Sequence, residues 1–243
     1  ALAANSFAAQ GGPSDAKAIL DRVEKNVTSH DEVATVKMTI TEPDGTKKDR
    51  ALEIRRKGAE ERQKVLVRMQ APADLKGTAL LSVSEGKQTD QWLYLPSSKQ
   101  TRRILSSKKS SNFMDSELSY EDMGTSSESQ FESKVLRQED WNGRKFTVIE
   151  NTPKGTSTYG KILIWVDLGT YLVGKMEYYD KSMKLLKVST FSGYKQYDKG
   201  VWRAQKVQVH NVQNKRGTIL ELSGLALNKG LEDEEFTESA LAD

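Results

Sequence analysis

Apolar and polar residues alternate with a period of two over most of the chain, which is the pattern of β-strands buried on one face. Val36, Met38 and Ile40 share one face of such a run, with lysine and threonine on the other. Strong turn signals separate the runs, among them Pro43-Asp44-Gly45 and Asn142-Gly143. Runs recurring at a spacing of roughly 8–12 residues predict an antiparallel barrel or a strongly curved sheet, because so many strands must curl to bury an apolar face.

One segment near the start has a helical period instead. Its apolar residues recur at the spacing of one helix face: Ala16, Ile19, Leu20, Val23 and Val27. Ser14-Asp15 supplies a helix N-cap directly before them. Because the rest of the chain has the pattern of strands, we expect this helix to pack inside the curve of the sheet. Residues 14–243 are expected to form a single domain.

The composition favours an exported protein. Residues 1–13 are small and polar, and we expect them to be disordered. Ala1-Leu2-Ala3-Ala4-Asn5 resembles the small-residue end left by removal of a signal peptide. The chain has no cysteine, which excludes a disulfide and a thiolate nucleophile, and no apolar run reaches about 18 residues. The missing N-terminal cysteine for lipid attachment favours a soluble protein over an anchored one. We therefore expect a soluble periplasmic protein without a lipid anchor.

The charges do not favour a nucleic-acid partner. The chain has 37 basic and 34 acidic residues, a formal net charge of +3, and the two signs are interspersed along the strands. The densest basic cluster is Arg102, Arg103, Lys108 and Lys109. It is compatible with phosphate or anionic lipid, and equally with a solvated loop.

Groups for catalysis are sparse. His30 and His210 are far apart, and no acidic cluster has a histidine at ligand spacing, so we predict no metal site and no cofactor. No serine lies in a Gly-x-Ser-x-Gly elbow, and no glycine-rich phosphate loop opens a helix. We therefore predict that the protein is not an enzyme. A hydrolase stays an open alternative, because catalytic triads are recognised by geometry and not by spacing.

The strands carry more apolar side chains than one helix can cover. The run from Gln91 to Leu95 is apolar on both faces, as in a strand that is covered on one side and lines a concavity on the other. We predict a cavity suited to acyl chains, lined by Val36, Met38, Ile54, Val67, Met69, Leu81, Trp92, Tyr94, Trp165, Met176 and Tyr178. Ordinary core packing is the alternative for each of these residues.

Several short segments together have the pattern of a known family. They are Ala71-Pro72-Ala73-Asp74-Leu75-Lys76-Gly77-Thr78, Trp92-Leu93-Tyr94-Leu95-Pro96, Arg102-Arg103-Ile104, Ser119-Tyr120-Glu121-Asp122-Met123, Trp165-Val166-Asp167 and Tyr178-Tyr179-Asp180. This set resembles the outer-membrane lipoprotein-sorting (LolA/LolB-like) family, most closely its uncharacterised periplasmic branch. The resemblance spans roughly Asp31 to Leu227.

The resemblance implies a mainly β (α+β) fold. Its expected form is a half-open, strongly curved antiparallel β-barrel of about ten or eleven strands, with an N-terminal helix and short loop helices plugging the concave face. It implies binding of lipid or lipoprotein acyl chains, without enzymatic activity. It also implies a strand arginine tied to lid opening, for which the candidates are Arg50, Arg55, Arg62 and Arg68.

Two functions follow from these patterns. The first is a periplasmic carrier that binds acyl chains and passes cargo between the envelope membranes, with transient membrane contact. Its gating loop is expected to comprise Phe113, Met114, Leu118, Tyr120 and Met123. The second is a non-enzymatic docking or sensor module for an inner-membrane exporter, with the loop from Ser97 to Thr125 as its contact surface.

Overall fold

A single large antiparallel sheet forms most of the molecule. The computed structural model describes residues 15–59, 62–86, 88–124 and 128–242. Within these residues thirteen strands form one sheet in the order β6-β5-β4-β3-β2-β1-β15-β14-β11-β10-β9-β8-β7, and β12 pairs with β13. The strands are β1 (Asp31–Thr41), β2 (Lys47–Ala59), β3 (Arg62–Ala71), β4 (Ala79–Glu85), β5 (Gln88–Leu95), β6 (Gln100–Arg103), β7 (Phe131–Trp141), β8 (Arg144–Pro153), β9 (Lys161–Asp167), β10 (Leu172–Tyr179), β11 (Leu185–Ser192), β12 (Lys195–Gln196), β13 (Trp202–Arg203), β14 (Lys206–Asn211) and β15 (Gly217–Leu227).

One α-helix and several 3₁₀ turns accompany the sheet in the described residues. The helix is α1 (Ala16–Val27), and the Asp15 carboxylate accepts a hydrogen bond of 2.9 Å from the Lys17 backbone N–H, so the predicted cap and helix are confirmed. The 3₁₀ turns are η1 (Ser106–Lys108), η2 (Phe113–Asp115), η3 (Glu128–Gln130), η4 (Asp198–Gly200), η5 (Asp233–Phe236) and η6 (Ser239–Ala242). Ser14 and the segment 1–13 lie outside the described residues.

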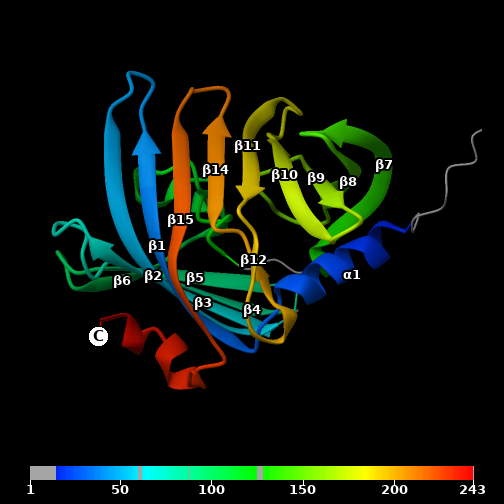
Figure 1. Cartoon of the computed structure of the whole chain (residues 1–243). Helices are drawn as coiled ribbons and strands as arrows, with labels where there is room; N and C mark the ends of the chain where they lie inside the picture. The colour runs from blue at the N-terminus through cyan, green and yellow to red at the C-terminus, as the bar shows by residue number, and fades with distance from the viewer. Residues whose placement is uncertain (1–14, 60–61, 87, 125–127, 243) are drawn as a thin grey trace, which may run out of the picture.

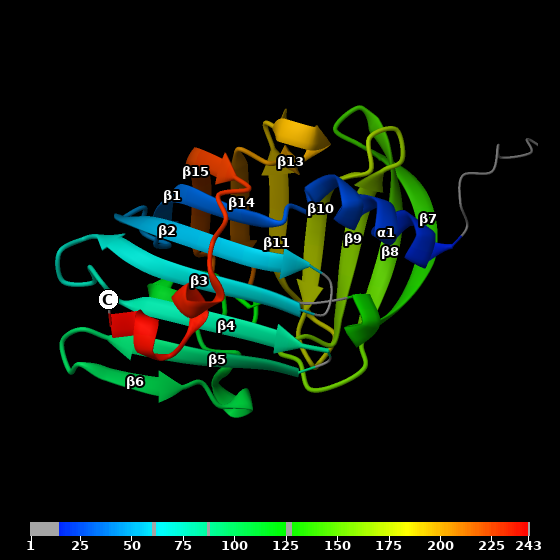
Figure 2. The ribbon, with the colours of Figure 1, turned by 90° about the horizontal axis from the view of Figure 1, so that it is seen from below.

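The sheet curls without closing on itself. Figure 1 shows β1, β2, β15 and β14 standing side by side while β3, β4 and β5 cross beneath them, and Figure 2 shows the same curl from below. Strands β6 and β7 end the order and are not paired with each other. The mainly β, curved and open character is thus as predicted.

The predicted strand number is wrong, because the described residues contain fifteen strands and not ten or eleven. Strand β6 reads Gln-Thr-Arg-Arg and is exposed throughout, so it has no apolar alternation to reveal it. Strands β12 and β13 have two residues each, too few for any period to be recognised. Hydrogen bonding to a neighbouring strand, not side-chain pattern, defines these elements.

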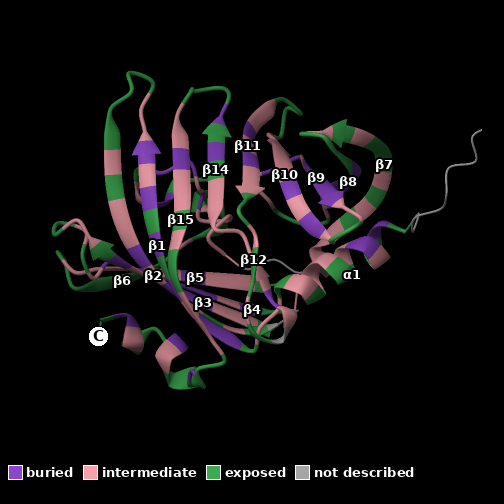
Figure 3. Cartoon of the chain, viewed as in Figure 1, coloured by how far each residue is buried: buried purple, intermediate pink, exposed green. Residues whose placement is uncertain are grey.

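A continuous row of side chains identifies the concave side, which we call the inner face. Each member lies directly opposite the next on a neighbouring strand: Ile40, Thr218, Val209, Ser189, Met176, Ile164, Ile149 and Val135. Figure 3 shows buried and more exposed positions alternating along these strands. The period of two therefore separates the inner face from the outer face over most of the sheet.

Two segments cover different parts of the inner face. Phe113–Met123, which we call the plug segment, packs on the apolar side chains of β1 to β5. Helix α1 packs on β7 to β10, where Ala16 and Ile19 are buried against Ile149 and Ile164. A helix and a short loop helix were expected to fill the concave side, and α1 and the plug segment lie there. Figure 1 shows α1 lying at the β7 end of the sheet.

The chain end covers part of the outer face. Residues 228–242, which we call the C-terminal segment, bury Leu231, Phe236 and Leu241 against Leu66 and Leu81. Arg68 donates to the carbonyl oxygens of Ala240 and Leu241 at 3.0 and 3.1 Å. This contact hides apolar residues of β3, β4 and β5 that would otherwise face solvent. Among the described residues, no helix is both long enough and apolar enough to cross a membrane.

Candidate functional site

A cavity of about 650 Å³ lies between α1 and the inner face. The helix contributes Leu20 and Val23, whose apolar face follows from the 3.6-residue period. Inward positions of the sheet contribute Phe131, Met176, Phe191 and Val207. The cavity volume falls within the range of about 300–1,000 Å³ that is typical of small-molecule sites. The arrangement can take apolar chains out of water.

Polar contacts fix α1 along its flank and leave its apolar face toward the cavity. Arg22 donates to the Tyr171 hydroxyl at 2.5 Å, with its guanidinium 4.5 Å from the centre of that ring. Asn26 donates from Nδ2 to the Thr170 carbonyl oxygen at 2.8 Å. Both partners lie in the turn between β9 and β10, so this turn determines where the helix sits.

The hairpin of β12 and β13, which we call the arm, contacts the C-terminal end of α1. Arg203 of the arm donates to the Val27 carbonyl oxygen at 2.6 Å, and from Nε to Glu32 at 2.9 Å. Tyr194, just before β12, donates to the Val173 carbonyl oxygen at 2.9 Å, and burial raises the pKa of Tyr194 to about 12. The arm thus closes the cavity beside the last turn of the helix.

Charged residues line part of the cavity. Among the described residues that line it, four are basic and two are acidic: Arg56, Lys57, Lys64, Arg203, Glu24 and Glu32. Arg56 lies 3.2 Å from Glu32, while Lys57 and Lys64 lie 3.2 and 3.0 Å from Asp233. Asp233 thus pairs with both lysines, and Glu32 pairs with both Arg56 and Arg203. With Glu24 included, the four cations exceed the three carboxylates by one.

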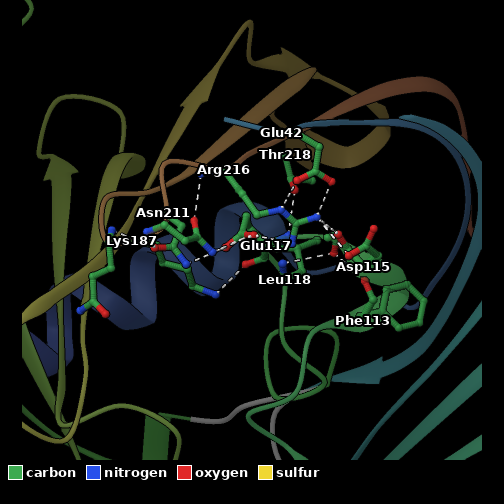
Figure 4. Close-up of polar contacts among 12 residues, drawn as sticks. Glu42, Phe113, Asp115, Glu117, Leu118, Lys187, Asn211, Arg216 and Thr218 are labelled. Atoms are coloured by element: carbon green, nitrogen blue, oxygen red, sulfur yellow. Dashed lines mark hydrogen bonds and ion pairs between the residues drawn. The ribbon is translucent and has the colours of Figure 1, made fainter. Parts of the chain in front are cut away.

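The plug segment is anchored by a buried ionic cluster, shown in Figure 4. The side chain of Glu117 is 2% exposed and accepts hydrogen bonds from Arg216 at 3.0 Å and from Asn211 at 2.6 Å. The backbone N–H of Glu117 donates to the Thr218 hydroxyl at 2.9 Å. Asn211 ends β14, Thr218 lies in β15, and Arg216 lies in the turn between these two strands, so the plug segment is held against the β14–β15 hairpin.

Arg216 also binds two other carboxylates. It donates to both oxygens of Glu42 at 2.8 and 2.9 Å and to Asp115 at 3.0 Å. These hydrogen bonds, with that to Glu42 the largest cause, raise the pKa of Arg216, and Arg216 in turn lowers the pKa of Glu42. Met114 and Asp115 have φ angles of 48° and 62°, in the left-handed region that side chains rarely adopt. The contacts of Asp115 hold this strained backbone in place.

A second ion pair anchors the far end of the plug segment. Lys187 and Asp122 form a buried salt bridge, and the Tyr159 hydroxyl donates to Asp122 at 2.7 Å. The Lys187 ammonium lies 5.2 and 5.0 Å from the ring centres of Tyr159 and Tyr178, within the range of cation–π attraction. Burial, followed by the nearby charge of Asp122, raises the pKa of both tyrosines, so both hydroxyls stay protonated.

Solved structures with the same architecture place this chain in a family. A domain from Vibrio parahaemolyticus, described as an outer membrane lipoprotein-sorting protein, is 32% identical, with 94% of this chain and 100% of that chain covered and a TM-score of 0.89. The chain belongs to the outer-membrane lipoprotein-sorting family.

Other comparisons agree with this family assignment. A DUF1329 family protein from Desulfovibrio piger is 29% identical over 93% of this chain and 98% of that chain, with a TM-score of 0.87. A LolA superfamily protein from Nitrosomonas europaea shares the fold at 24% identity, over 93% and 98% of the two chains, with a TM-score of 0.77. A family model described as an uncharacterized protein matches residues 61–243. No curated protein matches the chain in sequence.

The residues expected to line one cavity divide among four apolar clusters of this lipoprotein-sorting fold. Those under the plug segment are Val36, Met38, Ile54, Val67 and Met69. Met176 and Tyr178 lie in the cluster beneath α1, and Met176 lines the cavity itself. A ligand role for these residues stays a prediction.

Four of the expected residues lie on the outer face. Leu81, Trp92 and Tyr94 pack with the C-terminal segment, and Trp165 packs with Trp141 and Phe146. They do not share a concavity with the inner-face residues. Strands β4, β5 and β9 are apolar on both faces, so alternation alone does not say which face is inner.

The predicted gating loop coincides with the plug segment. Phe113 is 1% exposed, and Met114, Leu118, Tyr120 and Met123 pack partly buried on the same cluster. The wider contact surface expected from Ser97 to Thr125 is only partly accessible. Thr101–Arg103 is exposed, whereas most of the plug segment is buried or half-buried. Thr125 lies outside the described residues. A gating role for the loop stays a prediction.

Several cavity residues were not expected from the sequence. Phe191 and Val207 follow the alternation of β11 and β14, and that signal was present in the sequence. Trp202 belongs to a two-residue strand of the arm and has no such signal. Of the candidate arginines, Arg55 and Arg68 bind the C-terminal segment. Within the described residues no three histidine, aspartate or glutamate side chains are grouped as metal ligands would be.

Proposed function

We propose that the protein is a periplasmic carrier that binds an acyl chain of a lipid or lipoprotein in the cavity beneath α1. The observation that carries this proposal is the cavity of about 650 Å³, lined by Leu20, Val23, Met176, Phe191 and Val207, in a member of the lipoprotein-sorting family. A carrier needs an apolar site that opens to the surface, because its cargo must enter and leave.

The free energy of binding comes from burying hydrocarbon. Each methylene removed from water contributes about 0.8 kcal/mol, so affinity rises steeply with chain length until the cavity is full. Met176 adds an adaptable side chain that packs against chains of differing shape. This mode of binding needs no catalytic group.

Cations near the cavity support contact with a membrane. Arg56 lies on the inner face and lines the cavity, whereas the opposed pair Lys57 and Lys64 lies on the outer face and binds Asp233. Lysine and arginine near an anionic leaflet each contribute about 1 kcal/mol to attraction, so contact with a membrane is weak and transient. Such contact is what delivery of cargo between the envelope membranes requires. The description of the Vibrio parahaemolyticus domain supports a lipoprotein as that cargo.

Displacement of a fluorescent fatty acid tests the proposal. We expect purified protein to bind the probe, and unlabelled fatty acids to displace it more strongly as their chains lengthen. Val23→Gln places an amide on the cavity side of α1 and should weaken binding about tenfold or more, because that amide is buried against hydrocarbon. Lys25→Gln puts the same residue on the exposed side of α1 and should not change binding. Absence of probe binding, or equal binding by both variants, would contradict a carrier function.

A further inference from the structure

One buried polar side chain faces the cavity without a hydrogen-bond partner. Asn151 of β8 is 7% exposed and lines the cavity together with Met176 and Phe131. Its Oδ1 atom is buried and accepts no hydrogen bond from any described residue. Buried polar groups are nearly always hydrogen-bonded, so an unpaired one at a ligand site indicates which hydrogen-bonding group the ligand supplies.

A second unpaired oxygen lies beside it. Asn151 is directly opposite Ser133 of β7, and the Ser133 Oγ is likewise buried without a partner among the described residues. Opposed residues of antiparallel strands have Cβ atoms about 4.5–5.5 Å apart and point to the same face. Asn151 lines the cavity, and Ser133, which does not line it, lies next to Asn151 on the same face; we call these two unpaired side chains the polar step.

The chemistry of the two oxygens limits what satisfies them. The Asn151 Oδ1 only accepts a hydrogen bond, whereas the Ser133 hydroxyl both donates and accepts. A ligand hydroxyl can donate to Asn151 and accept from Ser133 at once. An amide N–H only donates, and a plain methylene chain leaves both oxygens unpaired.

We infer that the cargo is a hydroxylated acyl chain, whose hydroxyl binds Asn151 and Ser133 while its hydrocarbon fills the cavity. This inference rests on the proposed carrier function and specifies its substrate class. The rest of the wall around Met176 and Phe191 recognises hydrocarbon in general, so the polar step is the element that selects among chains.

The test compares three competitors in the fluorescent displacement assay: tetradecanoic acid, 3-hydroxytetradecanoic acid and N-dodecanoylglycine. We expect the wild type to bind the hydroxylated acid about three- to tenfold more tightly than the plain acid, as one net hydrogen bond allows. Asn151→Leu should bind both acids equally, and Ser133→Ala should lose part of the preference. Thr152→Val, at the exposed neighbouring position, should keep the full preference.

Each outcome has a separate meaning. Equal binding of the plain and hydroxylated acids by the wild type overturns the inference and leaves the carrier function standing. Tighter binding of N-dodecanoylglycine than of the hydroxylated acid also overturns it, in favour of an amide. Binding of none of the three removes the carrier function and the inference together.

Thermal unfolding of the ligand-free proteins distinguishes a role of Asn151 in ligand binding from a role in folding. Asn151→Leu replaces an unpaired buried amide with hydrocarbon, so the variant should melt at the same or a higher temperature than the wild type. A lower melting temperature would show that Asn151 serves the fold instead of the ligand, and would overturn the inference.

Discussion

At the scale of single residues, Arg216 pairs with three carboxylates. It binds Glu42, Asp115 and the buried Glu117, and its own side chain is 15% exposed. Arg216→Met would leave Glu117 charged and buried without its cation, which costs about 3 kcal/mol in the free energy of unfolding. Urea unfolding at pH 7 measures this loss. Lys37→Met breaks an exposed pair with Asp49 and should change stability by about 0.5 kcal/mol or less.

The pH dependence of the same variant follows from the direction of the shifts. Hydrogen bonds from Arg216 and Lys48 lower the pKa of Glu42 below 4.5, and those from Lys48 and Arg216 lower the pKa of Asp115 below 3.8. A carboxylate with a lowered folded pKa stabilises the protein above its ordinary pKa, and this stabilisation is lost as pH falls through the folded value. The wild type should therefore lose more stability than Arg216→Met between pH 5 and about pH 3. A parallel decline of the two proteins would contradict this assignment.

At the scale of elements, local patterns were predictable and distant contacts were not. The spacing of Ile19, Leu20 and Val23 located α1, because a helix period is complete within a dozen residues. The site of the plug segment depends on Glu117 meeting Arg216, which is 99 residues further along the chain. No period in either segment records that contact. A cavity was predicted, but the residues that line the cavity beneath α1 depend on the position of the helix relative to the sheet.

The C-terminal segment shows how a weakly patterned element contributes to stability. Phe236 is 3% exposed and packs on the outer face with Leu66 and Leu81. Phe236→Ala should lower the free energy of unfolding by about 3 kcal/mol, since it removes a buried ring and leaves a cavity. Glu238→Ala, at an exposed position of the same segment, should have little effect. A small effect of both changes, measured by urea unfolding, would mean that this segment is not part of the cooperative fold.

At the scale of the whole molecule, the two coverings of the inner face differ in how they are held. The plug segment is held by buried charges, of which Glu117 and Lys187 are 2% and 4% exposed. Helix α1 is held on its flank by hydrogen bonds from Arg22, Asn26 and Arg203, several of them exposed to solvent. Breaking solvent-exposed contacts costs less than separating buried ion pairs. We therefore expect α1, and not the plug segment, to move when cargo enters.

Hydrogen exchange measured by mass spectrometry tests this difference. In the ligand-free protein, amides of α1 should exchange faster than those of the plug segment, because local opening follows the least stable contacts. Fatty acid should slow exchange in α1, whose Leu20 and Val23 line the cavity, and leave the plug segment nearly unchanged. Arg203→Met removes the contact with Val27 and should speed exchange at the end of the helix. If the plug segment exchanges faster and is the part protected by fatty acid, then it is the gate, and the cavity beneath α1 is not the route of entry.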